Sequence, residues 1–110
     1  MHIRVLGSAA GGGYPQWNCN HPNSRRARTG DPAAPPRTQS SIALSANGED
    51  WVLFNASPDL RQQIFDNDIL HPSGALRASP IRAVVLTNAD VDHVAGLLNL
   101  RESQAFNLYA

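Results

Sequence analysis

An acidic loop that carries a histidine follows an apolar, strand-like run late in the sequence. The run AVVL at residues 83–86 leads directly into TNADVDHVAGL at residues 87–97. In α/β proteins, ligand and catalytic sites collect where strands end and helices begin. This junction therefore predicts an α/β fold with its chemistry at residues 87–97.

Three potential metal ligands, Asp90, Asp92 and His93, lie close together in this loop. Two neighbouring carboxylates repel each other unless a cation, a proton or a basic group lies between them. A purely structural interpretation is also open. In it, Asp90 caps the following helix, Asp92 occupies the favoured first turn, and His93 packs against a neighbour.

The loop resembles the signature THxHxDHxxGL of the metallo-β-lactamase superfamily. The matching positions are Asp92, His93, Gly96 and Leu97. Asn88 and Asp90 stand where the signature has its first two histidines. The loss of two imidazoles argues against a zinc hydrolase and favours metals that accept oxygen ligands, such as iron or manganese.

Two further strings make the resemblance specific. GGGYPQWNC occupies residues 11–19, and NASPDLRQQI occupies residues 55–64. With the acidic loop, they resemble the pyrroloquinoline quinone (PQQ) biosynthesis protein B family, PqqB, over nearly the whole chain. The resemblance implies an α/β fold, a metallo-β-lactamase-like αβ/βα sandwich, of which residues 1–110 form the N-terminal portion of a single domain. The strand-like ending FNLYA would lack neighbours, which favours self-association.

The resemblance also implies a function in PQQ biosynthesis. The implied protein is cytoplasmic and acts on a tyrosine-derived peptide precursor, as an iron-dependent oxygenase that hydroxylates the tyrosine ring. Asp90, Asp92 and His93 would be its catalytic residues and would hold Fe(II), with further ligands supplied from elsewhere. This chain alone is then expected to show no turnover. Two alternatives stay open: a non-catalytic carrier that takes PQQ or its precursor toward the periplasm, and a truncated remnant.

A second metal site is suggested near the N-terminus. In the family, the segment after the tryptophan commonly reads CxCxxC, which is the spacing of a small structural zinc site. The corresponding residues here are Cys19, His21 and Ser24. Cys19 and His21 could still bind Zn(II), whereas the hydroxyl of Ser24 is a poor replacement for a thiolate. Cys19 as a small apolar packing residue is the other interpretation.

Composition and charge exclude several classes of protein. Nine arginines balance nine acidic residues, and aromatic residues make up only 6%. Neither value is typical of nucleic-acid binding. No apolar run approaches the roughly 20 residues that span a bilayer, and no secretory pattern opens the sequence. With its single cysteine, the chain is expected in the cytoplasm.

The pattern of apolar and turn residues predicts five strands and two helices. The strands are expected at residues 2–6, 40–45, 51–55, 81–86 and 106–110, with the second and third paired as a hairpin. The helices are expected at residues 57–66 and 91–102. Proline and glycine predict a loop without regular structure at residues 20–37.

The first helix has predicted roles for several side chains. Ser57 is expected to cap it, with Leu60, Ile64 and Phe65 on its buried side. Asp59 is left with two roles, helix capping and the orientation of a ligand histidine.

Glycines are expected to permit close approaches around the site. Those at residues 11–13 should turn the chain tightly past it, since no lysine follows to make a phosphate-binding loop. Tyr14, Pro15 and Trp17 are expected to close over the core. Gly96 should let the second helix lie close to the sheet.

Overall fold

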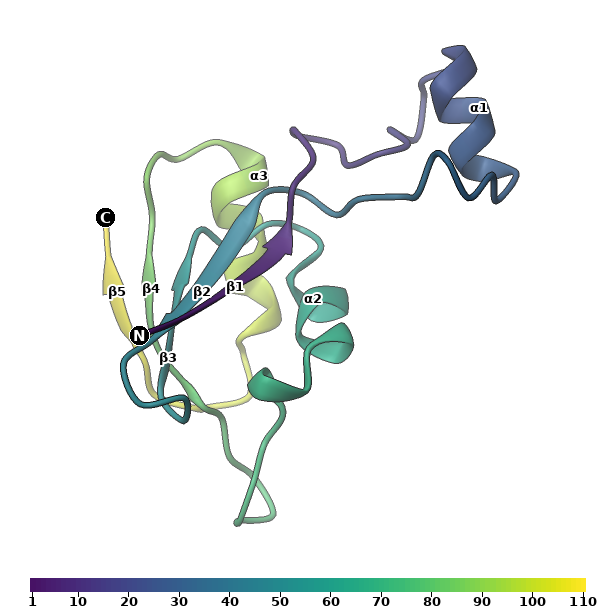
Figure 1. Ribbon diagram of the computed structural model, residues 1–110. Coiled ribbons are helices and arrows are strands. Elements are labelled where there is room, and N and C mark those ends of the chain that lie inside the picture. Colours follow the sequence, from purple (N-terminus) through teal and green to yellow (C-terminus); the bar gives the residue numbers. More distant parts are fainter.

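The chain folds around one five-stranded mixed sheet (Figure 1), seen in a computed structural model that describes residues 1–110. The strands, which are neighbours in chain order, are β1 (His2–Gly7), β2 (Ser41–Ser45), β3 (Trp51–Phe54), β4 (Ile81–Val85) and β5 (Asn107–Tyr109). The first three pair antiparallel, and β3, β4 and β5 pair parallel. The five predicted strands and the hairpin are confirmed.

Helices cover one face of this sheet, while α1 projects away from it (Figure 1). The helical elements are α1 (Pro22–Arg28), α2 (Leu60–Asp66), the 3-10 turn η1 (Asp68–Leu70), α3 (Val91–Val94) and the 3-10 segment η2 (Ala95–Asn99). The core lies between sheet and helices, and its fully buried apolar side chains include Leu53, Leu60, Leu70 and Val84. No helix is long and apolar enough to cross a membrane.

The opposite face of the sheet is apolar and partly exposed. Residues paired across neighbouring strands point to the same face. Two rows of such pairs run across the sheet on that face: Ile3, Leu44 and Val52, and Val5, Ile42, Phe54 and Val85. At its edge, Ile3 and Val5 are 65% and 62% exposed. We call these seven side chains the outer face.

The loop predicted at residues 20–37 is wrong in part, because α1 forms within it. Pro22 is the first residue of this helix, where its fixed φ is favourable and its missing N–H costs nothing. The ring Nδ1 of His21 accepts a hydrogen bond from the Asn23 backbone N–H at 3.2 Å. Pro22 therefore begins a helix and does not prevent one.

The second predicted helix, at residues 91–102, is also wrong in extent. Helix α3 ends at Val94, and the chain continues as the 3-10 segment η2. The backbone N–H of Gly96 donates to the carbonyl oxygen of Ala56 at 2.8 Å, so it is not available to continue the α-helical ladder. Contact with a distant backbone segment therefore ends the helix.

Three smaller predictions are corrected around α2 and the glycine loop. Helix α2 begins at Leu60, and Ser57 lies in the preceding turn, where its hydroxyl accepts from the Asp59 N–H at 3.2 Å. Leu60 is buried as predicted, but Phe65 is 75% exposed. Trp17 is 83% exposed and does not close over the core.

Candidate metal centre

Asn55, at the end of β3, fixes the start of the acidic loop. Its side-chain oxygen accepts hydrogen bonds from the backbone N–H and the hydroxyl of Thr87, at 2.9 and 3.1 Å. Asn55 has a φ of 65°, a left-handed conformation that asparagine adopts more readily than most residues. The sequence placed Asn55 at a strand end but did not indicate this role.

A second set of contacts fixes the turn that carries His93. The Ala56 backbone N–H donates to the His93 carbonyl oxygen at 2.7 Å, and the Gly96 N–H donates to the Ala56 carbonyl oxygen. A Cβ on Gly96 would lie 2.0 Å from the carbonyl oxygen of Ser57. The predicted close approach of Gly96 is confirmed, and it brings the loop against the end of β3.

Asp90, Asp92 and His93 come together as one cluster. One potential ligand atom from each residue lies within 4.8 Å of the others, and no other group of three or more such residues occurs in the chain. The Nδ1 of His93 lies 2.8 Å from Oδ1 of Asp92, and these side chains are only 20% and 24% exposed. Since a carboxylate accepts, Nδ1 carries the hydrogen, and Nε2 keeps its lone pair for a ligand.

The donor set fits a divalent metal ion. Asp90 occupies the N-cap position of α3, but its side chain makes no capping hydrogen bond. Neither Asp90 nor Asp92 pairs with an arginine, so a cation would relieve their mutual repulsion. One imidazole nitrogen and several carboxylate oxygens suit iron or manganese better than they suit structural zinc.

The glycine loop at residues 11–13 borders this cluster. A Cβ on Gly11 would lie 3.2 Å from Oδ2 of Asp92. Gly12 and Gly13 have φ values of 89° and 75°, which glycine adopts without strain. The expectation that the glycines turn the chain past the site agrees with this arrangement.

Asp59 does not cap α2, and its role in orienting a ligand histidine stays a prediction. It occupies the N-cap position of α2, but its side chain makes no capping bond. Its Oδ2 accepts hydrogen bonds from the backbone N–H and the side-chain Nε2 of Gln39, at 2.9 and 3.0 Å. The ligand candidate His93 instead contacts Asp92.

The family of the chain follows from comparison with known proteins. A family model described as a beta-lactamase superfamily domain matches residues 50–110, which contain β3, α2, β4 and the acidic loop. The chain belongs to the β-lactamase superfamily. The fold predicted from the sequence is thereby confirmed.

Within this superfamily, the chain matches the N-terminal portion of coenzyme PQQ synthesis protein B. The protein of that name from Methylobacterium radiotolerans is 64% identical over 109 residues, which cover 99% of this chain and 36% of the relative. The Xanthomonas oryzae pv. oryzae protein is 61% identical over 110 residues, covering 100% of this chain and 37% of the relative. The chain thus spans little more than a third of these relatives' length.

Comparison with solved structures agrees with this fold. The crystal structure of Zn(2+)-bound PqqB from Methylobacterium extorquens superposes with a TM-score of 0.98 at 64% identity, covering 100% of this chain and 37% of that one. A diphosphatase of the PhnP family gives a TM-score of 0.74 at 27% identity, covering 98% and 40%. Human tRNase Z, short form, gives 0.61 at 21% identity, covering 99% and 34%, and shows the fold alone.

The second site predicted in this superfamily member, at Cys19 and His21, is not assembled as a ligand cluster. The Ser24 hydroxyl donates to Sγ of Cys19 at 3.2 Å, and Nδ1 of His21 accepts the hydrogen bond that begins α1. No third histidine, cysteine or carboxylate joins them. Zinc binding at Cys19 and His21 stays a prediction, with two ligands in place of the usual four.

Hydrogen bonding lowers the pKa of the Cys19 thiol from its ordinary value. Hydrogen bonding from Ser24 does most to lower the pKa of Cys19, the His21 backbone and Arg28 lower it further, and partial desolvation opposes them. We expect Ser24→Ala to raise this pKa. Only the thiolate is alkylated. The pH at which the rate of iodoacetamide alkylation increases should therefore be higher in Ser24→Ala than in the wild type.

Thr29→Val is the matched control for this prediction. Thr29, at the C-terminal end of α1, also carries a hydroxyl. This hydroxyl donates to the carbonyl oxygens of Arg25 and Arg26 and not to the thiol. Its removal should leave the alkylation profile of Cys19 unchanged. Identical profiles for Ser24→Ala and the wild type would show that the hydroxyl does not control the thiol.

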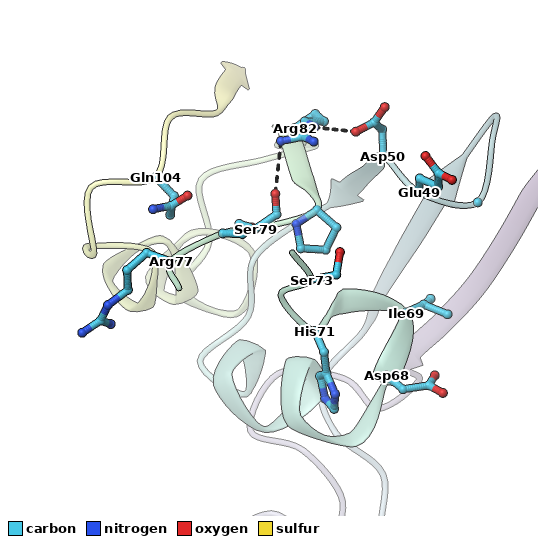
Figure 2. A pocket seen from close by; sticks show the side chains of 13 residues that line it. Glu49, Asp50, Asp68, Ile69, His71, Ser73, Arg77, Ser79, Arg82 and Gln104 are labelled. Atoms are coloured by element: carbon cyan, nitrogen blue, oxygen red, sulfur yellow. Dashed lines mark hydrogen bonds and ion pairs between the residues drawn. The ribbon is translucent and has the colours of Figure 1, made fainter. Parts of the chain in front are cut away.

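A cavity of about 630 Å³ lies at the other end of β4 from the acidic loop (Figure 2). Arg82 at its edge is paired with Asp50 and also donates to the Ser79 carbonyl oxygen. The Nε2 of His71 lies 3.0 Å from the Phe65 carbonyl oxygen. The lining contains no cluster of three candidate ligands.

Proposed function

We propose that this chain supplies the metal-binding N-terminal portion of a PQQ biosynthesis protein that hydroxylates a tyrosine-derived precursor. The observation that carries the proposal is the cluster of Asp90, Asp92 and His93 at the strand-to-helix junction. The relatives named coenzyme PQQ synthesis protein B support the pathway. The Zn(2+)-bound relative supports a metal ion, and the oxygen-rich donor set supports Fe(II) as the working metal.

The residues of the loop have separate tasks in this proposal. Asp92 holds the Nδ1–H of His93 through Oδ1, and this fixes the ring so that Nε2 is presented as a ligand. The Oδ1 of Asn88 accepts a hydrogen bond from the Asp90 backbone N–H at 2.9 Å, which shapes the turn. The Asp90 carboxylate itself makes no capping hydrogen bond. A bound Fe(II) supplies the redox chemistry that dioxygen requires.

A chimera tests the proposal in a protein of the relatives' length. This chain replaces the matching N-terminal portion of the M. radiotolerans relative, to which it is 64% identical. The anaerobically iron-loaded chimera, mixed with precursor peptide, air and a two-electron reductant such as ascorbate, should add one atom of dioxygen to the peptide, as seen by mass spectrometry, while the other atom is reduced to water. The Asp92→Ala chimera should not. Binding of PQQ without any oxidation of the peptide would favour the carrier function instead.

We also propose that the chain self-associates through its outer face. Ile3 and Val5 are exposed at the edge of this apolar surface, and uncovered apolar surface with a free strand edge promotes association. Light scattering should show oligomers that the double substitution Ile3→Glu, Val5→Glu reduces. Leu98→Glu, at an 80% exposed position on the helical side, should not reduce them. A monomeric wild type would refute this prediction.

A further inference from the structure

We propose that Gln39 and Asp59 form a positioning pair that holds the glycine loop against Asp92 and so controls the affinity of the metal centre. The inference rests on the proposed metal site, but neither residue is a candidate ligand. Their effect would pass through the backbone of Gly11 and Gly12.

The side-chain amide of Gln39 is fixed in one orientation. Gln39 is 6% exposed, and its Nε2 and backbone N–H both donate to Oδ2 of Asp59. A carboxylate can only accept, so the donor end of the amide must face Asp59. Its acceptor end, Oε1, then faces the glycine loop and accepts from the Gly12 N–H at 3.0 Å.

The hydrogen bond from Gly12 to Gln39 is made by a side chain and holds the middle of the glycine loop. Backbone hydrogen bonds hold its two ends, where Ala9 N–H donates to the Thr38 carbonyl oxygen and Tyr14 N–H to that of Arg37. Between them lie three consecutive glycines, which have unusually large conformational freedom. Without Gln39, the Gly12 N–H in the middle of the loop would lose this hydrogen bond.

The position of the loop matters because of Asp92. Gly11 lies so close that a Cβ would be 3.2 Å from Oδ2 of Asp92, while Oδ1 of the same carboxylate bonds His93. The loop and His93 therefore confine the carboxylate from two sides. Groups that orient metal ligands typically change metal affinity 10- to 100-fold when they are removed.

Neighbouring elements hold the backbone of Gln39 in place. Gln63 of α2 is 1% exposed and donates to the Gln39 carbonyl oxygen at 2.8 Å and to the Thr38 hydroxyl at 3.1 Å. A Cβ on Gly7 would lie 2.1 Å from that same Gln39 carbonyl oxygen. The backbone of Gln39 is thus held by α2 and β1, and its side chain reaches the Gly12 N–H in the middle of the loop.

Metal competition against a chromophoric chelator, with Zn(II) and with anaerobic Fe(II), tests the pair. Gln39→Leu and Asp59→Ala should each weaken metal binding about 10- to 100-fold, with circular dichroism unchanged. Gln62→Leu is the matched control, because Gln62 is an exposed glutamine of α2 that bonds only Asp66. It should leave the affinity unchanged.

A conservative variant keeps the test decisive if a single variant misfolds. Gln39→Glu places two carboxylates together and should weaken binding, whereas Asp59→Asn keeps one oxygen that can accept from both donors of Gln39 and should retain the affinity. Unchanged affinity in Gln39→Leu, while Asp92→Ala abolishes binding, would overturn the positioning pair alone. Unchanged affinity in Asp92→Ala would overturn the metal centre itself.

Discussion

Replacing Gly96 by alanine is expected to destabilise the fold by about 3 kcal/mol, at the upper end of the usual cost of overpacking. The new Cβ would lie 2.0 Å from the Ser57 carbonyl oxygen and 2.7 Å from the carbonyl carbon and oxygen of Ala56. All three contacts are with backbone atoms, so no side-chain rotation can relieve them. The displacement would also break the Gly96 to Ala56 hydrogen bond.

Urea denaturation followed by circular dichroism measures this effect. Leu98→Ala, in the same 3-10 segment but 80% exposed, should change the unfolding free energy by less than about 0.5 kcal/mol. Equal stability of Gly96→Ala and the wild type would mean that η2 does not lie against the Ala56–Ser57 backbone.

Asp92→Ala is expected to weaken metal binding by at least about 100-fold, more than the loss of an outer group costs. The substitution removes one candidate ligand and also the hydrogen bond that orients a second, since Oδ1 of Asp92 lies 2.8 Å from Nδ1 of His93. Isothermal titration calorimetry with Zn(II), or with Fe(II) under nitrogen, measures the affinity.

Asp68→Ala is the control for that measurement. Asp68 is an exposed carboxylate at the start of η1, outside the cluster, and its removal should not alter the affinity. If both substitutions had the same effect, the metal would be binding to general negative charge and not to the acidic loop.

Strands were predictable here because their signal is local. Alternation of buried and exposed residues in β2 and β3, with the turn at Asn47 and Gly48 between them, lies within single segments of sequence. The apolar spacing of Val94, Leu97 and Leu98 equally indicated one continuous helix. The predicted helix is interrupted because the Gly96 N–H donates to the carbonyl oxygen of Ala56, 40 residues earlier in the sequence. No local pattern reveals this contact.

The helix α1 was missed for a different reason. Pro22 and the glycine and prolines that follow counted as helix breakers, but a proline at the first helical position favours the start of a helix. The cap is a histidine, His21, which is not among the residues that usually signal an N-terminus.

In the candidate site, the closeness of the three candidate ligands was predictable, and the contacts that support them were not. Asp90, Asp92 and His93 are neighbours in sequence, so their spacing alone brings them together. Gln39 lies 20 residues from Asp59, and Asn55 lies 32 residues from Thr87. These hydrogen bonds form only when the sheet brings the residues together, so they cannot be predicted from a single sequence.

The most direct test of the account is the response of the four histidine rings to metal in an NMR titration. His2, His21, His71 and His93 are all of the histidines in the chain, and only His93 belongs to the cluster. Addition of Zn(II), or of Fe(II) under nitrogen, should change the His93 ring signals first and saturate near about one ion per chain. Metal binding that changes His21 and leaves His93 unaffected would contradict a metal centre at the acidic loop.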